Sequence, residues 1–303
     1  MIEISVLVLT KNEARNVGAC LEAIFSQQTS AEFEVIVVDS GSSDETLEIA
    51  RQYPAKIYEI PVGTFHHART RNYAASLAEG SHLVYLAADA LPVNGDWLEV
   101  LISNFSDPRV GAVYGRHLPK PGATTERQIV LSAVYGDERL VKNASCRSEL
   151  GYRYYHFSTV NAALRRSVWQ AIPFPEDLKV FEDVGIAKGI LDAGWRIVYE
   201  PRACVYHSHN HSTKELFRRY FDSGVVSRRL RLVDREARES LRREAWRLLR
   251  QNWALPSGNG HRGMVWQTML RNLAKSIGWM LGRKEQYLPL RLKRRFSSFG
   301  LFG

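Results

Sequence analysis

The sequence predicts an α/β protein with a mixed, mostly parallel sheet, helices on both faces of that sheet, and a helical appendage at its C-terminal end. In the first part of the chain, apolar runs of strand length alternate with amphipathic helical stretches, which is typical of βαβ units. The composition then changes, because residues 201–303 carry 22 Lys and Arg against 7 Asp and Glu. The hydrophobic content of 45% is ample for a sizeable core.

The predicted elements follow from hydrophobic periodicity. Residues 2–10 form a nearly continuous run of β-branched residues and leucine, as in a strand buried on both faces. Residues 14–27 have apolar side chains at helical spacing. The same patterns predict further strands at 33–38, 56–60, 83–86, 110–115 and 195–201, and a strand beginning near Phe157. They predict further helices at 45–53, 66–79, 124–141, 167–172 and 182–194.

Polar residues follow three of these strands where each ends, at Thr10, Asp39 and Asp89. Right-handed crossovers bring such ends to one edge of the sheet, where open α/β sheets bind ligands. A carboxylate such as Asp39 can accept the ring N–H of a pyrimidine, and Gly41 lets a base approach the backbone. Each loop also has an ordinary explanation, with Asp44 or Asp89 capping the following turn or helix. Together they predict nucleotide binding, while the missing G-x-G-x-x-G motif disfavours an NAD enzyme.

The stretches Val6–Glu13 and Val35–Thr46 resemble the opening motifs of family 2 glycosyltransferases, which are inverting enzymes with the Rossmann-like GT-A fold of nucleotide-diphospho-sugar transferases. The resemblance covers roughly residues 2–225, with its motifs in the family's order. It implies that the first loop and the Asp ending the second strand hold the base of a nucleotide-sugar. The nucleotide-binding residues that it implies are Thr10, Asn12, Glu13, Asp39, Gly41, Asp44, Arg71, Asn72 and Ala88.

Asp89 falls on the family's Asp-x-Asp metal motif, which reads Ala87-Ala88-Asp89 here, so the first carboxylate is missing. One carboxylate with phosphate oxygens and water can still hold a hard divalent cation. The resemblance implies Mg²⁺ or Mn²⁺ held by Asp89 and His207, because a histidine at this point commonly completes the family's metal and diphosphate site. The missing carboxylate leaves the metal dependence open.

His207 is followed by His209 and His211 at alternating positions, with Cys204 nearby. This is also the pattern of a zinc site, or of an extended segment with one functional histidine and the others solvated.

The acidic pair Glu182-Asp183 opens a predicted helix, where the helix dipole alone would stabilise carboxylates. The resemblance places the family's acidic pair here. An inverting transfer needs a base that takes the proton of the acceptor hydroxyl. The prediction is that Asp183 is this base and that Glu182 orients the acceptor or supports the metal site. The residues expected to contact the sugar or the acceptor are Asn161 and Trp195.

The C-terminal part reads as two helical stretches, 214–250 and 264–281, with basic and apolar sides. Basic amphipathic helices with Trp and Phe suit an anionic membrane surface. The same pattern would also suit nucleic acid, or a helical appendage with a solvated Arg face. No window approaches the length of a membrane span, no signal peptide is seen, and three cysteines without framework spacing favour a reducing compartment. We expect a cytoplasmic protein, peripheral on the inner face of the cell membrane.

The Asp89–Pro92 and Tyr114–Pro119 stretches are most similar to the bacterial rhamnosyltransferase branch of the family. The resemblance implies transfer of a sugar, rhamnose in that branch, from a dTDP- or UDP-sugar to a hydroxyl of a glycan or lipid-linked glycan. The expected catalytic domain is 1–211, with a nucleotide half at 1–118 and an acceptor half at 119–211, and the basic region is 212–303.

Two alternatives remain at this stage. A nucleotidyltransferase would need a Gly-rich phosphate loop, which Lys11–Arg15 is not. A non-catalytic protein that binds a membrane or nucleic acid through the basic helices would tolerate changes at Asp39, Asp89 and Asp183. No nucleic-acid partner is expected for the transferase, and the sequence does not determine the oligomeric state.

Overall fold

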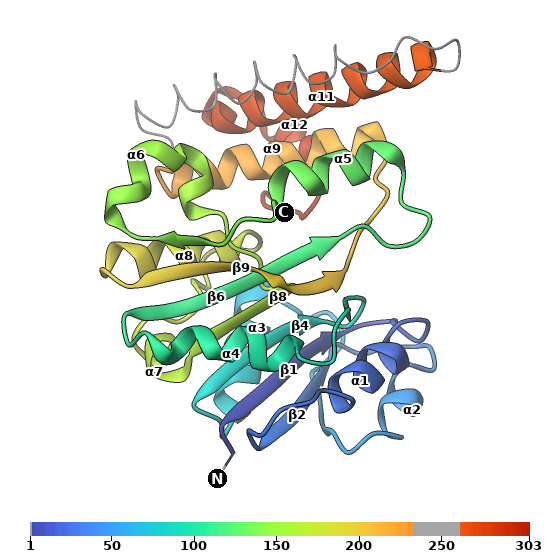
Figure 1. Ribbon diagram of the computed structural model, residues 1–303. Coiled ribbons are helices and arrows are strands. Elements are labelled where there is room, and N and C mark those ends of the chain that lie inside the picture. Colours follow the sequence, from blue (N-terminus) through green and yellow to red (C-terminus); the bar gives the residue numbers. More distant parts are fainter. Residues whose placement is uncertain (1, 233–260) are drawn as a thin grey trace. The chain divides into compact units, whose positions relative to one another are not determined.

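The structure is a computed structural model that describes residues 2–232 and 261–303 (Figure 1). The chain forms two compact units. The first unit consists of Met1–Ala144, Phe157–Asp177 and Glu182–His209. The second unit consists of Ser145–His156, Leu178–Phe181 and Asn210–Gly303.

The first unit begins with four parallel strands in the order β3-β2-β1-β4, as the βαβ pattern predicted. The register pairs Thr10 with Asp39 and Leu9 with Ala87, so the carboxyl ends of β1, β2 and β4 meet at one edge. The strands are β1 (Ile4–Thr10), β2 (Phe33–Asp39), β3 (Lys56–Glu59) and β4 (His82–Ala87). The helices between them are α1 (Val17–Phe25), α2 (Thr46–Ala50) and α3 (His67–Leu77).

The second half of the sheet is mixed. Strand β8 (Asn161–Arg165) lies antiparallel between β4 and β6 (Val110–Leu118), and β9 (Arg196–Tyr206) runs parallel to β6. Because β8 is antiparallel to both β4 and β6, strands β6 and β9 run in the same direction as β4. The carboxyl end of β9 therefore lies at the same edge of the sheet as that of β4. The remaining elements of this unit are β5 (Leu91–Pro92), β7 (Leu140–Lys142), α4 (Trp97–Ser103), α5 (Thr125–Val134), α7 (Arg166–Ala171) and α8 (Glu182–Asp192).

The two faces of β1 pack against different helices. Ile4, Val6 and Val8 belong to a buried cluster with residues of α1 and α4. Leu7 alternates to the other face, where α3 packs against β1 and β2. The expected sheet with helices on both faces is confirmed (Figure 1).

Two predicted elements differ in extent. The helix expected over 124–141 ends at Val134, because Tyr135 leaves the helical conformation and residues 140–142 pair with β9 as strand β7. An amphipathic pattern cannot show that a sheet edge is available for pairing. Strand β9 continues to Tyr206, past the predicted end at residue 201. The register against β6 jumps from Glu200 to Cys204, so Pro201, which has no N–H, lies in a bulge.

The second unit is mainly helical, with α6 (Arg147–Leu150), α9 (Thr213–Arg229), α11 (His261–Arg283) and α12 (Leu290–Phe296). Ser212 and Glu215 form a capping box that starts α9. The helix predicted over 214–250 ends at Arg229, and the part of that prediction after residue 232 lies outside the described residues. Among the described helices, none is long and apolar enough to cross a membrane. Short 3₁₀ turns in the chain occupy Asn104–Ser106, Ala144–Cys146, Gly151–Tyr155 and Glu285–Tyr287.

Candidate functional site

The loop after β2 is organised by Asp39, whose side chain is completely buried. The carboxylate accepts hydrogen bonds from the backbone N–H groups of Gly41 and Ser42, each at 2.8 Å, and from the Ser42 hydroxyl. Gly41 has a φ of 78°, and an added Cβ would lie 2.4 Å from a methyl group of Val62. Asp39 therefore shapes the loop, and its contact with a base stays a prediction.

The loops after β1 and β2 are hydrogen-bonded to each other. The Asn12 side chain accepts a hydrogen bond from the backbone N–H of Ser43 at 2.8 Å. Asp44 accepts one from the backbone N–H of Ala14 at 3.2 Å. The hydrogen bond from the Thr46 hydroxyl to Asp44 contributes most to holding the pKa of that carboxyl below its ordinary value. Asn12 and Asp44 thus support the loops, and direct contact with a nucleotide stays a prediction for both.

A pocket lies beside these loops, with a volume of about 240 Å³. Two buried hydroxyls in its wall, on Thr10 and Tyr85, have no hydrogen-bond partner among the described residues. Burial also raises the pKa of Tyr85 far above its ordinary value. Unpaired buried hydroxyls are costly, and a polar ligand that reached these two would satisfy them. Its lining includes these residues expected at the nucleotide or metal: Thr10, Glu13, Arg71, Ala88 and Asp89.

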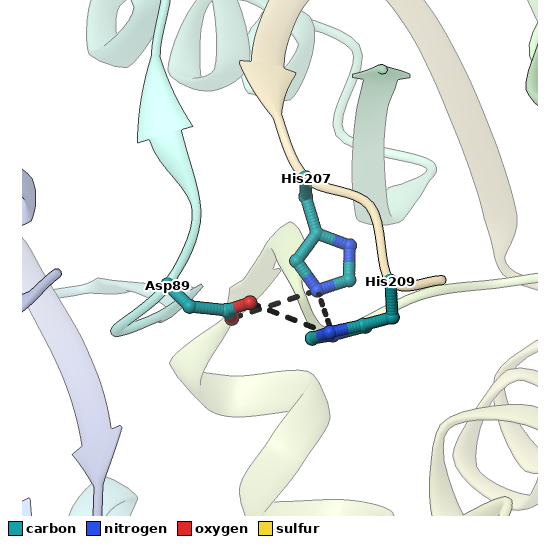
Figure 2. A group of neighbouring side chains, drawn as sticks. All are labelled: Asp89, His207 and His209. Atoms are coloured by element: carbon teal, nitrogen blue, oxygen red, sulfur yellow. Dashed lines mark hydrogen bonds and ion pairs between the residues drawn. The ribbon is translucent and has the colours of Figure 1, made fainter. Parts of the chain in front are cut away.

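Asp89, His207 and His209 form a cluster at the same edge of the sheet (Figure 2). Asp89 follows β4, and the two histidines follow β9. The Asp89 carboxylate oxygens lie 3.5 Å from His207 Nε2 and 3.4 Å from His209 Nε2. The two Nε2 atoms are 3.1 Å apart. One carboxylate oxygen and two imidazole nitrogens therefore converge on one point, which suits a divalent transition-metal ion.

The electrostatics of the cluster favour the ligand forms of these side chains. Burial lowers the pKa of His207 to about 4, so its ring is neutral at pH 7 and can bind a cation. Burial opposes ionisation of Asp89, but its electrostatic interactions with His207, Lys120 and His209 together outweigh that effect and lower the pKa of the carboxyl. Lys120 Nζ lies 3.3 Å from the Asp89 carboxylate. The set of side chains fits a divalent cation, with Lys120 as a further positive charge at the site.

His209 and Lys120 were not among the predicted site residues. The alternation of His207 and His209 was a signal for the first, because alternate residues of an extended segment share a face. Lys120 follows β6, about 30 residues from Asp89 in the chain, and no motif marks it. The antiparallel pairing of β8 with both β4 and β6 brings Lys120 to this edge.

The two residues of the acidic pair at the start of α8 lie in different environments. Glu182 is buried and forms an ion pair with Arg71 at 2.8 Å. Asp183 forms no ion pair with any described residue and accepts a hydrogen bond from the backbone N–H of Val184 at 2.8 Å. Burial and the charge of Glu182 raise the pKa of Asp183 to about 7, against the opposing charge of Arg71. Asp183 can therefore exchange a proton near neutral pH.

Two sets of contacts connect this pair with the rest of the site. Arg71 lines the pocket and also holds Glu182. Asp183 lies close enough to Tyr135 to raise the pKa of that phenol, after the larger effect of burial. The Tyr135 ring stacks on His117, with centroids 4.3 Å apart, and His117 meets the His207 ring edge-on. The pocket, the cluster and the acidic pair thus belong to one region of the first unit.

Three predicted site residues have other surroundings. The side chain of Asn161 is completely buried, accepts a hydrogen bond from Trp97 Nε1 and donates one to the Ala203 carbonyl, each at 2.9 Å. Its expected contact with a sugar is therefore corrected to a role in the core. Trp195 precedes β9 and packs beside Gly111, at the opposite edge of the sheet from Asp89, so the structure does not bring it to the site.

Asn72 holds the segment before α8. Its amide donates to the Phe174 carbonyl at 2.9 Å and accepts from the Phe174 N–H and from Trp169 Nε1, each at 3.0 Å. The amide is thus occupied within the protein, and its direct contact with a nucleotide stays a prediction.

Comparisons with known proteins agree on one family. The sequence profile of "Glycosyl transferase family 2" matches residues 5–172. "O-antigen chain rhamnosyltransferase WbaN" of Salmonella anatum is 35% identical over 279 residues, 91% of this chain and 87% of the relative. "O-antigen chain rhamnosyltransferase RfbN" of Salmonella typhimurium is 32% identical over 303 residues, 98% of this chain and 95% of the relative.

Solved structures agree on the fold. The mannosyltransferase PcManGT from Pyrobaculum calidifontis in complex with GDP-Man and Mn²⁺ matches with a TM-score of 0.61 at 19% identity, covering 92% of this chain and 87% of that one. S. aureus TarS 1–349 in complex with UDP-GlcNAc matches with a TM-score of 0.58 at 20% identity, covering 96% and 83%.

Proposed function

The chain belongs to glycosyl transferase family 2 and has a GT-A-like fold, and on this premise we propose that it transfers rhamnose, with inversion, from a dTDP- or UDP-linked donor. The acceptor is a hydroxyl of a glycan or lipid-linked glycan. The observation that carries the proposal is the pocket beside β1, whose lining includes Thr10, Arg71 and Asp89. The sugar is suggested by the names of the Salmonella relatives.

In this proposal the nucleotide lies in the pocket, with Thr10 and Glu13 at the base and Arg71 near the phosphates. The loops supported by Asp39 and Asp44 form its wall. We assign the catalytic domain to residues 1–211, with the nucleotide half at 1–118 and the acceptor half at 119–211. Residues 212–303 form the basic region.

We assign the divalent cation to Asp89, His207 and His209. When bound, Mn²⁺ or Mg²⁺ supplies positive charge that stabilises the leaving diphosphate. Imidazole nitrogens favour Mn²⁺ over Mg²⁺, which prefers oxygen ligands. Lys120, next to Asp89, is placed to pair with a phosphate oxygen.

Asp183 acts as the general base and removes the proton of the acceptor hydroxyl as that oxygen attacks the anomeric carbon. Glu182 is a positioning residue, because its ion pair with Arg71 links the start of α8 to the wall of the pocket. Its negative charge also keeps the pKa of Asp183 high enough for proton transfer at neutral pH.

The test is the release of free nucleoside diphosphate from a panel of nucleotide-sugars, with Mn²⁺, Mg²⁺ or EDTA present. We expect metal-dependent release from one donor, and greater release when a glycan or lipid-linked glycan acceptor is supplied. Failure of every donor to bind or turn over with both kinds of acceptor would overturn the proposal.

Transfer is expected to depend on pH through Asp183, whose pKa is raised to about 7. The protonated carboxyl cannot accept a proton, so kcat/KM should fall about tenfold for each pH unit below this pKa and level off above it. Glu182→Gln removes a neighbouring negative charge and should move the break to lower pH. A profile without a break near neutral pH, or a break that Glu182→Gln leaves in place, would argue against Asp183 as the base.

Thr10→Val tests the donor pocket. The Thr10 hydroxyl is buried without a partner, so its removal should raise the free energy of unfolding of the free protein by about 1 kcal/mol. If that hydroxyl binds the nucleotide, donor affinity should fall about tenfold. Thermal unfolding with and without dTDP or UDP measures both effects. The matched control is Ser40→Ala, which removes another unpartnered buried hydroxyl outside the pocket lining and should leave affinity unchanged.

We also propose that the protein acts at the inner face of the cell membrane, where a lipid-linked acceptor is held. This requires a surface that binds the membrane without crossing it.

A further inference from the structure

Helix α11 of the second unit carries a stripe of exposed apolar side chains. Trp266 is 65% exposed, Leu270 58% and Leu273 55%. Residues three, four and seven positions apart lie on one face of a helix. The exposed apolar side chains of α11 at such spacings are Trp266, Met269, Leu270, Leu273, Ile277 and Met280, and we call them the α11 stripe.

The opposite side of α11 is fixed against α9. Gly278 and Gly282 lie against the backbone carbonyls of Phe217 and Phe221, and an added Cβ would come within 2.3 Å of either oxygen. Gly224 of α9 approaches α11 equally closely. Rotation of α11 would bring the larger side chains of the α11 stripe to this contact, where there is room only for glycine. The α11 stripe therefore cannot be buried against α9.

The described segment that contains the stripe is almost entirely positive in charge. Residues 261–303 contain nine Lys and Arg and one acidic residue, Glu285. Glu285 is paired with Arg228 and, at 2.8 Å, with Lys293. The two acidic residues of α9 are also occupied, Glu215 in the capping box and Asp222 by the backbone N–H groups of Ser298 and Phe299. The exposed basic residues after α11 are Lys284, Arg291, Arg294 and Arg295.

We propose that the α11 stripe docks on an anionic phospholipid surface, with α11 lying in the interface and the neighbouring Lys and Arg contacting lipid headgroups. An apolar stripe beside excess positive charge is the chemistry of an interfacial helix. Nucleic acid offers phosphates but no counterpart for the stripe. A second copy of the chain would bring two positive segments together. The inference deepens the proposed function, because a lipid-linked acceptor gives membrane docking a purpose, but lipid binding does not require that function.

The experiment is flotation of the full chain with vesicles of phosphatidylcholine alone or with about 30% phosphatidylglycerol. We expect binding to the anionic vesicles, weakened by salt, and little binding to the neutral ones. Leu270→Glu together with Leu273→Glu should lower partitioning at least about tenfold, because two exposed apolar side chains are lost from the interface. Arg294→Ser together with Arg295→Ser should lower it by roughly fivefold per removed charge.

The matched control is Val62→Glu together with Val134→Glu, which adds the same charges at exposed apolar positions of the first unit. Its binding to anionic vesicles should stay within about twofold of wild type. Trp266 gives a second readout. Its fluorescence should shift to the blue and be quenched by brominated lipid, a change missing from Trp266→Phe.

Equal binding to neutral and anionic vesicles, or unchanged binding of the Leu270→Glu, Leu273→Glu variant, would overturn the proposal. So would a concentration-dependent dimer in light scattering that this variant abolishes, since the stripe would then bind a second copy. Vesicle binding needs no turnover, so it can succeed where every donor fails. Transfer to a soluble acceptor can likewise persist in a variant that no longer binds vesicles.

Discussion

Asp183→Asn is expected to lower the turnover of sugar transfer by about 10²–10⁴-fold, the usual contribution of a general base. Asparagine has nearly the same shape but cannot accept the proton of the acceptor hydroxyl. Donor binding should change little, because the pocket lining does not include Asp183. Turnover with acceptor, measured beside dTDP and UDP affinity, separates the two effects.

The control is Asp177→Asn, an exposed carboxyl only six positions away in the chain. It should retain transfer.

The raised pKa of Asp183 also predicts an effect on stability whose sign is defined. Since the native pKa exceeds the unfolded value, ionisation of Asp183 lowers stability as the pH rises from about 4 to about 7. The melting temperature of Asp183→Asn minus that of wild type should therefore be more positive at about pH 8 than at about pH 4. An active Asp183→Asn enzyme would exclude Asp183 as the base.

Asp89→Ala is expected to weaken Mn²⁺ binding at least about 100-fold and to lower metal-dependent transfer by about 10³-fold. Asp89 is the only carboxylate of the cluster, and two neutral imidazoles alone cannot offset the charge of a divalent cation. Mn²⁺ titration followed by electron paramagnetic resonance measures binding without turnover. Full transfer activity of Asp89→Ala in Mn²⁺ would refute its role.

Histidine variants refine this prediction. His209→Ala should weaken Mn²⁺ binding by about 10–100-fold, because it removes one of three ligands. His211→Ala should leave Mn²⁺ binding unchanged, because His211 is not a member of the cluster.

Ala87→Asp restores the missing carboxylate of the motif on a residue that lines the pocket. It should improve binding of Mg²⁺ more than that of Mn²⁺.

The sequence by itself determined the parallel half of the sheet and the loops at its edge. Short runs of β-branched residues and leucine, such as residues 2–10, favour buried strands, and the polar residues after them mark the strand ends. The conformation of Gly41 is also a local matter, because glycine adopts a positive φ more readily than other residues do. The fold class followed from such local signals, the resemblance of the motifs implied the family and the transferase activity, and all three were confirmed.

Only the tertiary structure decided which polar side chains meet. Asn161 looked available in the sequence but is held between Trp97 and Ala203 in the core. The last residues of the helix predicted over 124–141 form strand β7 instead, because β9 has an edge available for pairing. His209 and Lys120 reach Asp89 because β8 runs antiparallel and returns β6 and β9 to the edge where β4 ends. Strand order and direction depend on contacts between residues far apart in the chain, which hydrophobic periodicity does not record.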